Sequence, residues 1–463
     1  MARITHPKRA LSTNPLKSSA PLGAALAYLG IEGAVPLFHG SQGCTAFAMV
    51  HLVRHFKEAV PLQTTAMNEV STILGGAEQI EEAIENLRKK SNPRFIGIAS
   101  TALTETRGED VVGELKEILG RRTDFAGTAV VYASTPDFAG GLEDGWAKAV
   151  EAIVDSLVPA IDPVFRKSDP RQVNLLCGSY LTPAEVEELV RMIRAFGLEP
   201  IVLPDISTSL DGHVSENWSG TSLGGTRLAD IERMVESAFT LAVGESMRRA
   251  AKLIEDRAFV PYRVFHSVTG LKPVDAIVRT LMELAAQNDA PPSIKRDRAR
   301  LVDAALDAHF HIGGLKVALG ADPDLLFALS NCLAGLGAEI VTAVTTTTAN
   351  PVAGRVPAAE VLVGDLGDFE TSAASNGAQM LVTHAHGRHA AHNLHLPLLR
   401  AGFPIFDRLG AQDICRVGYR GTRAFLYEVA NIAQAQHHRA SPTDFGAAPI
   451  PEEFDHVPQI ATH

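Results

Sequence analysis

The chain is poor in cysteine and has no long apolar run, and these two absences exclude several classes of protein. Its 463 residues include only four cysteines, none of them close to another. This usage excludes a disulfide framework and fits a reducing compartment. The N-terminus has no apolar core of a signal peptide, and the apolar stretch 21–31 is too short to span a bilayer. We therefore expect a cytoplasmic protein with no membrane partner.

The sequence also lacks a net positive charge and the common catalytic motifs. The formal net charge is −11, which does not favour nucleic acid or an anionic membrane as a partner. With 46% apolar and 21% charged residues, the composition is that of a soluble globular protein. The sequence contains no P-loop, no HExxH motif and no Ser-His-Asp order. We therefore predict no catalytic residues.

The length and the patterning predict several α/β domains. The chain is too long for one core of ordinary size. Strand-like apolar runs alternate with helix-like periodic segments, which predicts mostly parallel sheets flanked by helices. We expect three such domains over residues 1–167, 168–297 and 298–440. The Pro-rich, acidic tail 441–463 is expected to be loosely ordered.

The clearest local unit is a strand, a helix and a second strand between residues 173 and 204. Thr182 and Glu185 form a capping box with Pro183 at the first helical position, and Gly197 ends the helix. The stretch 21–31 predicts a buried helix, and 228–257 predicts one long helix. Asp322 and Pro323 predict a helix cap. Further strands are expected at 94–100, 128–134, 316–320, 339–345, 359–365 and 378–384, and further helices at 324–336 and 422–436.

The most informative residue is Cys44, which ends the stretch His39-Gly40-Ser41-Gln42-Gly43-Cys44 and is expected in a loop. Glycines at 40 and 43 let the backbone pass close to whatever the sulfur touches. Such a thiolate suits an iron–sulfur cluster, which needs about four cysteine ligands. The other ligands would then come from a second polypeptide. The alternative is a small buried packing residue, and the pattern alone leaves both open.

The remaining candidate groups favour structural roles. Cys177 and Cys332 lie in apolar stretches and are interpreted as packing residues, and Cys415 as a spectator thiol in a loop. The stretch 220–225 resembles a phosphate cradle but fits a turn before a helix better, since it matches no phosphate motif.

A histidine-rich run follows the strand expected at 378–384. His384, His386 and His389, with His392 and His395 beyond them, could bind metal through their imidazoles. No carboxylate is interleaved, so a polar helix start is the favoured alternative.

Several longer motifs carry a specific resemblance. The stretch 39–44 is followed by Arg54-His55-Phe56-Lys57-Glu58 and Gln63-Thr64-Thr65-Ala66-Met67-Asn68-Glu69, and near the C-terminus by Ala401-Gly402-Phe403-Pro404-Ile405-Phe406-Asp407-Arg408. Together these stretches resemble the nitrogenase component 1 family over nearly the whole chain. The resemblance implies that family's three-domain α/β fold.

The resemblance also implies which metal ligands are present. In the β subunit of the molybdenum–iron protein, three cysteines bind a larger interface cluster. Here only Cys44 has a counterpart, and the other two positions appear as Leu62 and Ala102. Neither side chain can ligate iron, so the eight-iron electron-transfer centre is not expected. The pattern is similar to the family's scaffold subunits, which mature the iron–molybdenum cofactor.

For such a scaffold subunit, the resemblance implies carriage rather than turnover, with no independent catalytic activity. Cys44 would supply one ligand of a [4Fe-4S] cluster shared with the partner subunit NifE, which would contribute three cysteines and carry most of the cofactor precursor. An α2β2 heterotetramer is implied, with transient docking of the nitrogenase iron protein and of cofactor donor and carrier proteins. Two alternatives remain: a β-type subunit of a nitrogenase-like reductase, and a metal-free binding module.

Overall fold

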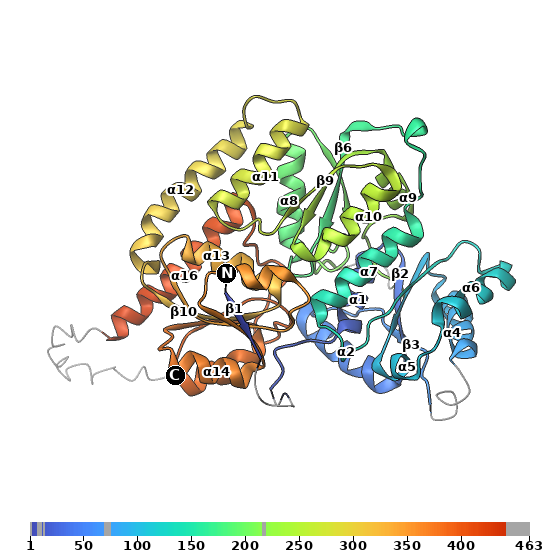
Figure 1. Ribbon diagram of the computed structural model, residues 1–463, viewed down its shortest axis with the longest axis horizontal. Coiled ribbons are helices and arrows are strands. Elements are labelled where there is room, and N and C mark those ends of the chain that lie inside the picture. Colours follow the sequence, from blue (N-terminus) through green and yellow to red (C-terminus); the bar gives the residue numbers. More distant parts are fainter. Residues whose placement is uncertain (1, 7–11, 13, 69–75, 215–218, 441–463) are drawn as a thin grey trace, which may run out of the picture.

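The structure is a computed structural model, and it describes residues 2–6, 12, 14–68, 76–214 and 219–440. These residues form three sheets whose strands all run parallel, with helices packed around them (Figure 1). The predicted α/β class, with parallel sheets flanked by helices, is confirmed. The tail 441–463 and residue Glu69 of the family motif lie outside the described residues.

The first sheet has the order β3-β2-β4-β5 and carries the Cys44 motif. All residues of β2 and β4 are buried, because apolar side chains on both faces are covered by helices. Its strands are β2 (Ala34–His39), β3 (Gln63–Thr64), β4 (Phe95–Ser100) and β5 (Ala129–Ala133). Its helices are α1 (Ala20–Leu29), α2 (Gln42–Phe56), α4 (Ala77–Ser91), α5 (Ala102–Arg107), α6 (Val111–Arg121) and α7 (Leu142–Leu157).

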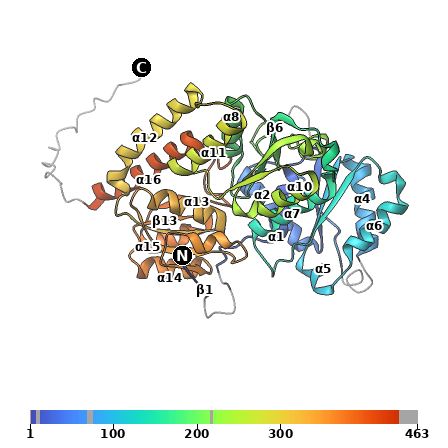
Figure 2. The ribbon, with the colours of Figure 1, turned by 45° about the horizontal axis from the view of Figure 1, so that its top comes forward.

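Two glycines let α1 and α7 pack backbone against backbone. A Cβ added to Gly145 would collide with the carbonyl of Ala20, and one added to Gly23 with the carbonyl of Leu142. The two helices lie side by side in both ribbon views (Figure 2). Every residue of α1 is buried, which confirms the helix predicted for 21–31.

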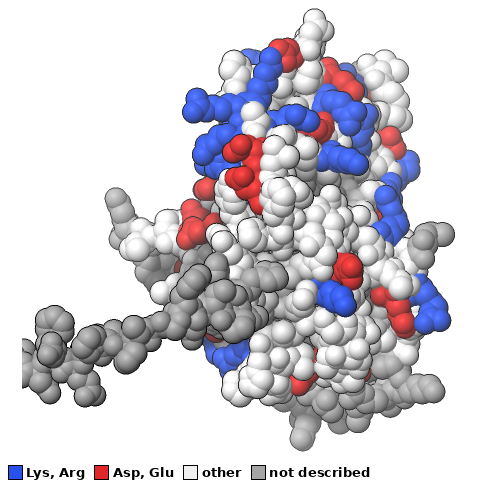
Figure 3. Space-filling model, turned by 90° about the vertical axis from the view of Figure 1, so that its left-hand side faces the viewer, with Lys and Arg blue, Asp and Glu red and all other residues white. Residues whose placement is uncertain are grey.

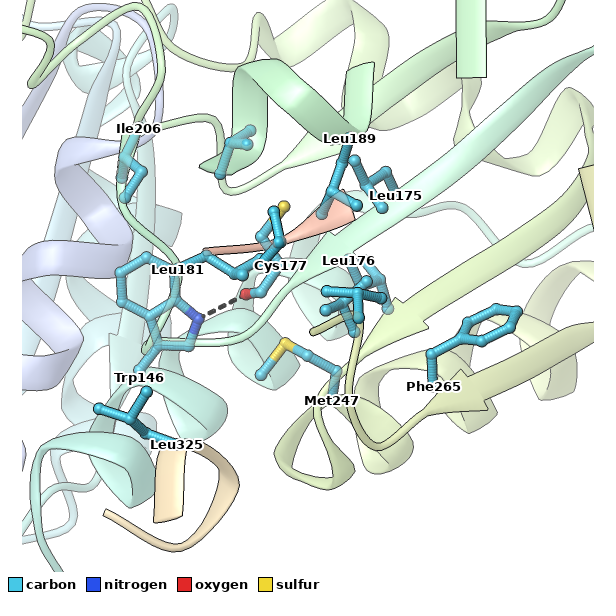
Figure 4. Packing of buried hydrophobic residues seen from close by; sticks show 14 of the residues in the cluster. Trp146, Leu175, Leu176, Cys177, Leu181, Leu189, Ile206, Met247, Phe265 and Leu325 are labelled. Carbon is cyan, nitrogen blue, oxygen red and sulfur yellow. Dashed lines mark hydrogen bonds between the residues drawn. The ribbon is translucent and has the colours of Figure 1, made fainter. Parts of the chain in front are cut away.

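The second sheet has the order β7-β6-β8-β9. Its strands are β6 (Asp169–Cys177), β7 (Glu199–Leu203), β8 (Ser237–Val243) and β9 (Tyr262–Phe265), and its helices are α8 (Pro183–Ala195), α9 (Leu228–Glu232), α10 (Arg248–Ala258) and α11 (Leu271–Leu284). The predicted strand–helix–strand unit is confirmed. Cys177 ends β6 inside the core, where the Trp146 indole donates a hydrogen bond of 2.8 Å to its carbonyl (Figure 4).

The single helix predicted for 228–257 is wrong. The segment instead forms α9, strand β8 and α10, with Gly244 at a φ of +98° just after the strand. Residues 239–243 pair with β6 on one side, and residues 240–243 pair with β9 on the other. This central position in the sheet prevails over helix-like periodicity.

The third sheet has the order β1-β12-β11-β10-β13-β14. Its strands are β1 (Arg3–Thr5), β10 (Lys316–Ala321), β11 (Glu339–Thr345), β12 (Glu360–Val363), β13 (Met380–Thr383) and β14 (Leu398–Arg400). Its helices are α13 (Pro323–Ala334), α14 (Leu366–Ser375) and α15 (Arg388–Leu394). Helices α12 (Pro292–Ile312) and α16 (Gly418–Ala440) pack against each other and against α8 and α11 of the second sheet. The strands and helices predicted in this region are present.

Two features depart from the predicted domain limits. Strand β1 pairs with β12, so residues 3–5 lie in the third sheet and not in the first. Helix α12 runs across the predicted limit between residues 297 and 298. Pairing between distant parts of the chain leaves no local trace, which is why the sequence could not predict the place of β1. The other limits remain a prediction.

Charged side chains are unevenly spread over the surface. Lys and Arg gather near the upper end of one face, where α12 begins (Figure 3). Many are matched by carboxylates: Arg298 binds Asp275 through two hydrogen bonds of 2.9 Å, and Lys295 pairs with Asp289. The described part of the chain contains no helix that is both long and apolar enough to cross a membrane.

Candidate metal-ligand site

Cys44 lies in the first turn of α2, not in a loop. Strand β2 ends at His39, Ser41 occupies the N-cap position with extended backbone, and Cys44 is the third residue of the helix. The Ser41 hydroxyl is 3.7 Å from the Cys44 sulfur. The Ser41 side chain makes no capping hydrogen bond, although serine is a favoured N-cap residue, and the helix begins earlier than predicted. The first-turn N–H groups and the positive end of the helix dipole favour a negatively charged ligand atom here.

The two glycines of the motif have different surroundings. A Cβ on Gly40 would overlap the Thr101 side chain, so close approach is required there. A Cβ on Gly43 would meet nothing nearer than the Ser41 hydroxyl, at 4.0 Å. Gly40 is thus needed for close packing against Thr101, and a close approach to whatever the sulfur binds stays a prediction. The space outside Gly43 is open, and Cys44 itself is exposed.

An apolar face of α2 continues from Cys44 along the helix. Phe47 is 75% exposed, Val50 50% and Val53 38%, at intervals of three residues. Residues three apart lie on one side of a helix, so these side chains form a stripe. Contiguous exposed apolar surface of this kind is typical of a protein–protein contact.

The two other family ligand positions lie on elements beside β2. Leu62 is buried in the main core and directly precedes β3. Ala102 is the first residue of α5, which follows β4, and Thr101 caps that helix. Strand β2 pairs with both β3 and β4. The topology therefore brings all three positions around one strand, but only Cys44 offers a ligand atom.

The other cysteines do not converge on Cys44. Burial raises the pKa of the Cys177 thiol well above its ordinary value and that of Cys332 to about 12. Cys415 lies between β14 and α16, half-buried, and burial raises its pKa to about 12 as well. All three thiols stay protonated near neutral pH. Among the described residues no three His, Cys, Asp or Glu side chains are placed to hold a metal ion.

The histidine run does not form such a group either. His384 is buried, its Nε2 donates to the Leu16 carbonyl at 3.0 Å and its Nδ1 accepts from the His386 amide at 3.3 Å. Both ring nitrogens are therefore engaged, and burial lowers the pKa of His384 to about 4. His386 packs edge-on against His51 at 6.0 Å between ring centroids. His389 lies on α15, where the predicted polar helix start is found.

A pocket of about 410 Å³ connects Cys44 with these histidines. Cys44, Phe47, His51 and His386 line it, together with Lys17 and Asp137. Burial lowers the pKa of both His51 and His386, so each presents a neutral ring at neutral pH. The pocket places an exposed thiol beside two neutral imidazole rings at the edge of the α2 stripe.

The glycine stretch 220–225 is a structural turn. Helix α9 begins only at Leu228 and has five residues. The Ser222 hydroxyl donates to the Ile31 carbonyl and accepts from the Ala34 amide at 2.8 Å. The segment 220–225, which lies between β7 and α9, is thereby hydrogen-bonded to the start of β2. It is a turn and not a phosphate cradle.

A buried carboxyl pair, which the sequence did not reveal, joins elements of all three sheets. Glu143 begins α7 and Asp324 begins α13, and Asn350 donates to both, at 2.6 Å to Glu143 Oε1 and 2.9 Å to Asp324 Oδ1. The Ser246 hydroxyl, after β8, donates to Asp324 Oδ2 at 2.6 Å. Burial and the neighbouring Asp324 raise the pKa of Glu143 well above its usual range, and burial raises that of Asp324.

The cap predicted at Asp322 forms only in part. Asp322 occupies the N-cap position of α13, but its side chain makes no capping hydrogen bond. It accepts instead from the Thr346 hydroxyl at 2.5 Å. The only sequence signal of the buried acidic junction was this Asp322-Pro323-Asp324 stretch, which local rules assign to a helix start.

The capping box of α8 predicts that the stability of the chain depends on pH. Glu185 is buried and accepts from the amides of Thr182 (3.0 Å) and Arg416 (2.8 Å). Burial raises its pKa to about 7, so the folded state holds the proton that the unfolded state releases near pH 4.5. The resulting stabilisation is full below pH 4.5 and is lost as pH rises through 7.

We therefore expect the free energy of unfolding of the native chain, relative to the Glu185→Gln variant, to fall by roughly 3 kcal/mol between pH 5 and pH 8. Urea unfolding at the two pH values measures this difference. Glu187→Gln, on the exposed side of the same helix, is the matched control and should track the native chain. A pH-independent difference for Glu185→Gln would contradict the raised pKa.

Comparison with known proteins decides the family. A family model described as nitrogenase component 1 type oxidoreductase matches residues 19–434. The chain belongs to the nitrogenase component 1 family. The resemblance predicted from the sequence is thus confirmed.

Full-length relatives refine the position within this family. A protein of Rhodobacter capsulatus is 71% identical over all of both chains. One of Mesorhizobium japonicum is 50% identical, covering 98% of this chain and 96% of its own, and one of Klebsiella pneumoniae is 37% identical, covering 95% and 94%. All three carry the name nitrogenase iron-molybdenum cofactor biosynthesis protein NifN. The scaffold-subunit type that the resemblance implied agrees with this name.

Solved structures agree with the fold. A chain titled Nitrogenase Cp1 at pH 6.5 superimposes with a TM-score of 0.87 at 29% identity, covering 95% of this chain and 97% of that one. A second chain, titled Nitrogenase Cp1 at pH 5, has a TM-score of 0.66 at 14% identity and supports the fold alone.

Proposed function

We propose that this chain is one subunit of a heteromeric scaffold on which the iron–molybdenum cofactor of nitrogenase is matured. Cys44 supplies one ligand to a [4Fe-4S] cluster at the contact with the partner subunit NifE. The observation that carries the proposal is the exposed thiol in the first turn of α2, which borders an unpaired apolar stripe. The names of the full-length relatives support the maturation role.

The number of cysteine ligands that a four-iron cluster needs indicates that the site is shared between two subunits. A four-iron cluster needs about four cysteine ligands, and the described residues offer one exposed thiol there. The remaining three come from the partner, whose apolar surface covers Phe47, Val50 and Val53. When bound, such a cluster supplies electron transfer. The chain's own residues would present the thiol, and the apolar stripe would exclude water once the partner covers it.

We infer the rest of the assembly from the family to which the chain belongs. Two such pairs form an α2β2 heterotetramer in the cytoplasm, and the cofactor precursor is carried mainly by the partner. The nitrogenase iron protein and the cofactor donor and carrier proteins dock transiently. The three domains, the first of which ends near residue 167, provide the walls of the assembly. The chain has no catalytic activity of its own.

Reconstitution with and without the partner tests this proposal. The purified chain, given iron and sulfide anaerobically, should retain no stoichiometric cluster, because one thiolate cannot hold four irons. The same treatment of the co-purified complex should give one four-iron cluster per pair of subunits, measured by iron analysis and electron paramagnetic resonance. A stable cluster on the isolated chain, or none in the complex, would contradict the proposal.

A second candidate is a β-type subunit of a nitrogenase-like reductase. The close superposition on a nitrogenase component 1 chain favours it. Leu62 and Ala102 argue against it, because they remove two of the three ligands that the larger cluster requires. Substrate reduction by the purified complex with the iron protein would distinguish the two functions, since a scaffold gives none.

A further inference from the structure

We infer that His39, Thr65 and Glu109 form a buried hydrogen-bonded clamp that positions the turn presenting Cys44. The clamp residues are positioning residues and do not contact the sulfur. The inference rests on the proposed function, because it assigns these side chains a role in holding the cluster ligand in place. It extends that function by naming residues outside the ligand set.

The clamp is a continuous chain of hydrogen bonds that starts in the Cys44 turn. The Gly40 amide donates to the Thr65 hydroxyl at 3.1 Å. That hydroxyl lies 3.1 Å from Nδ1 of His39, and Nε2 of His39 lies 3.0 Å from Glu109 Oε2. The other Glu109 oxygen accepts from Arg107, whose side chain is 27% exposed. The chain therefore runs from the backbone of the turn to the protein surface.

The chemistry of each group fixes the direction of this chain. The Glu109 carboxylate only accepts, so Nε2 of His39 carries the hydrogen. Nδ1 must then accept from the Thr65 hydroxyl, whose oxygen in turn accepts the Gly40 amide hydrogen. Burial is the main cause that lowers the pKa of His39, which keeps this neutral tautomer in place. One arrangement of protons satisfies all of the groups.

The opposite side of the same turn is held equally firmly. The Gly40 carbonyl accepts from the Met67 amide at 2.9 Å. The His39 carbonyl accepts from the Thr101 amide at 3.2 Å and from the hydroxyls of Thr101 and Thr104 at 3.1 and 3.3 Å. Both peptide groups of Gly40 are thus fixed by segments following β3 and β4. Local freedom begins only at Ser41, three residues before Cys44.

This much buried polarity is not needed to join β2 to α2. The His39 side chain is fully buried and that of Glu109 is 4% exposed, and burying a carboxylate costs free energy unless every oxygen is bonded. Apolar packing could close the same turn. Loss of groups bonded directly to a metal ligand costs about 10–100-fold in metal affinity, and the clamp acts one step further out, through the backbone of the turn. It has this outer role for the single thiol that this chain contributes.

The test is Thr65→Val in the complex with the partner subunit. Valine keeps the shape of threonine but removes the hydroxyl that links Gly40 to His39. We expect iron to leave the interface cluster for an external chelator about 10-fold faster, with changed g values in electron paramagnetic resonance. Glu109→Gln retains an acceptor for Nε2 and should stay close to native. It also serves as the comparison for Glu109→Leu, which should behave like Thr65→Val.

Thr128→Val is the matched control. Thr128 is as buried as Thr65, both 8% exposed, and it also donates and accepts one hydrogen bond, with Pro93 and Arg88. It precedes β5, at the opposite end of the same sheet, and should leave the iron loss and the spectrum unchanged. Native rates and spectra in both Thr65→Val and Glu109→Leu would overturn the clamp, and so would equal changes in Thr128→Val. If Cys44→Ala is also without effect, the proposed function fails; if Cys44→Ala alone disrupts the cluster, only the clamp fails.

Discussion

Cys44→Ala in the complex should remove the interface cluster or change its spectrum while leaving the fold intact. Alanine takes away one of about four ligands. Loss of an outer residue alone costs about 10–100-fold in metal affinity, so loss of the ligand itself should cost at least as much. Cys44 is exposed on the first turn of α2 and contributes little to the core. Iron content per complex and the spectrum of the reduced protein measure the effect.

Cys415→Ala is the control for this experiment. Cys415 is the other cysteine that is not fully buried, and its thiol stays protonated because burial raises its pKa to about 12. That variant should keep native iron and a native spectrum. Equal iron in Cys44→Ala and the native complex, with identical g values, would show that Cys44 is not a ligand.

Asn350→Leu should destabilise the chain by about 2–6 kcal/mol, because it takes a hydrogen-bond donor away from two buried carboxyl oxygens, at about 1–3 kcal/mol each. The Asn350 amide is the donor shared by Glu143 and Asp324, both almost completely buried. Without it, two carboxyl groups face each other across the junction of the three sheets. Urea unfolding at neutral pH measures the change in the free energy of unfolding.

The matched control is Asn331→Leu on α13, where the amide donates only to the Phe327 carbonyl within its own helix. The expected cost there is about 1 kcal/mol. Because the pKa of Glu143 is raised, acid should reduce the penalty of Asn350→Leu by protonating the carboxyl pair. A penalty equal to that of Asn331→Leu would mean that the junction does not depend on this amide.

Sequence rules worked where a local signal and the tertiary environment agree. The capping box of Thr182 and Glu185 and the glycine after α8 defined that helix to within a residue or two. The uniformly apolar stretch 21–31 gave a buried helix because small residues, Gly23 among them, allow it to meet α7 closely. Alternation of strands and helices was sufficient for the fold class.

The same rules failed where long-range pairing decides the structure. The residues of β8 have helix-like periodicity, but β6 and β9 take them into a sheet. Strand β1 pairs with a segment more than 350 residues away, which no local pattern can predict. The junction of Glu143, Asp324 and Asn350 brings together three parts of the chain in the same way.

For the candidate site, the sequence provided the residue but not its surroundings. The glycines around Cys44 and the family motifs indicated a ligand. The apolar stripe was hidden in an ordinary amphipathic pattern, because exposure of Phe47 or Val50 depends on what the fold leaves uncovered. The clamp was equally hidden, since His39, Thr65 and Glu109 meet only when β2, β3 and β4 are side by side.

The most direct test of the central claim replaces the Cys44 sulfur with the magnetic isotope of selenium. The labelled chain is assembled with its unlabelled partner, and the reduced cluster is examined by electron–nuclear double resonance. If Cys44 binds iron, we expect a hyperfine coupling between the cluster's electron spin and the selenium nucleus. An intact four-iron spectrum without any selenium coupling would show that the cluster is held entirely by other residues.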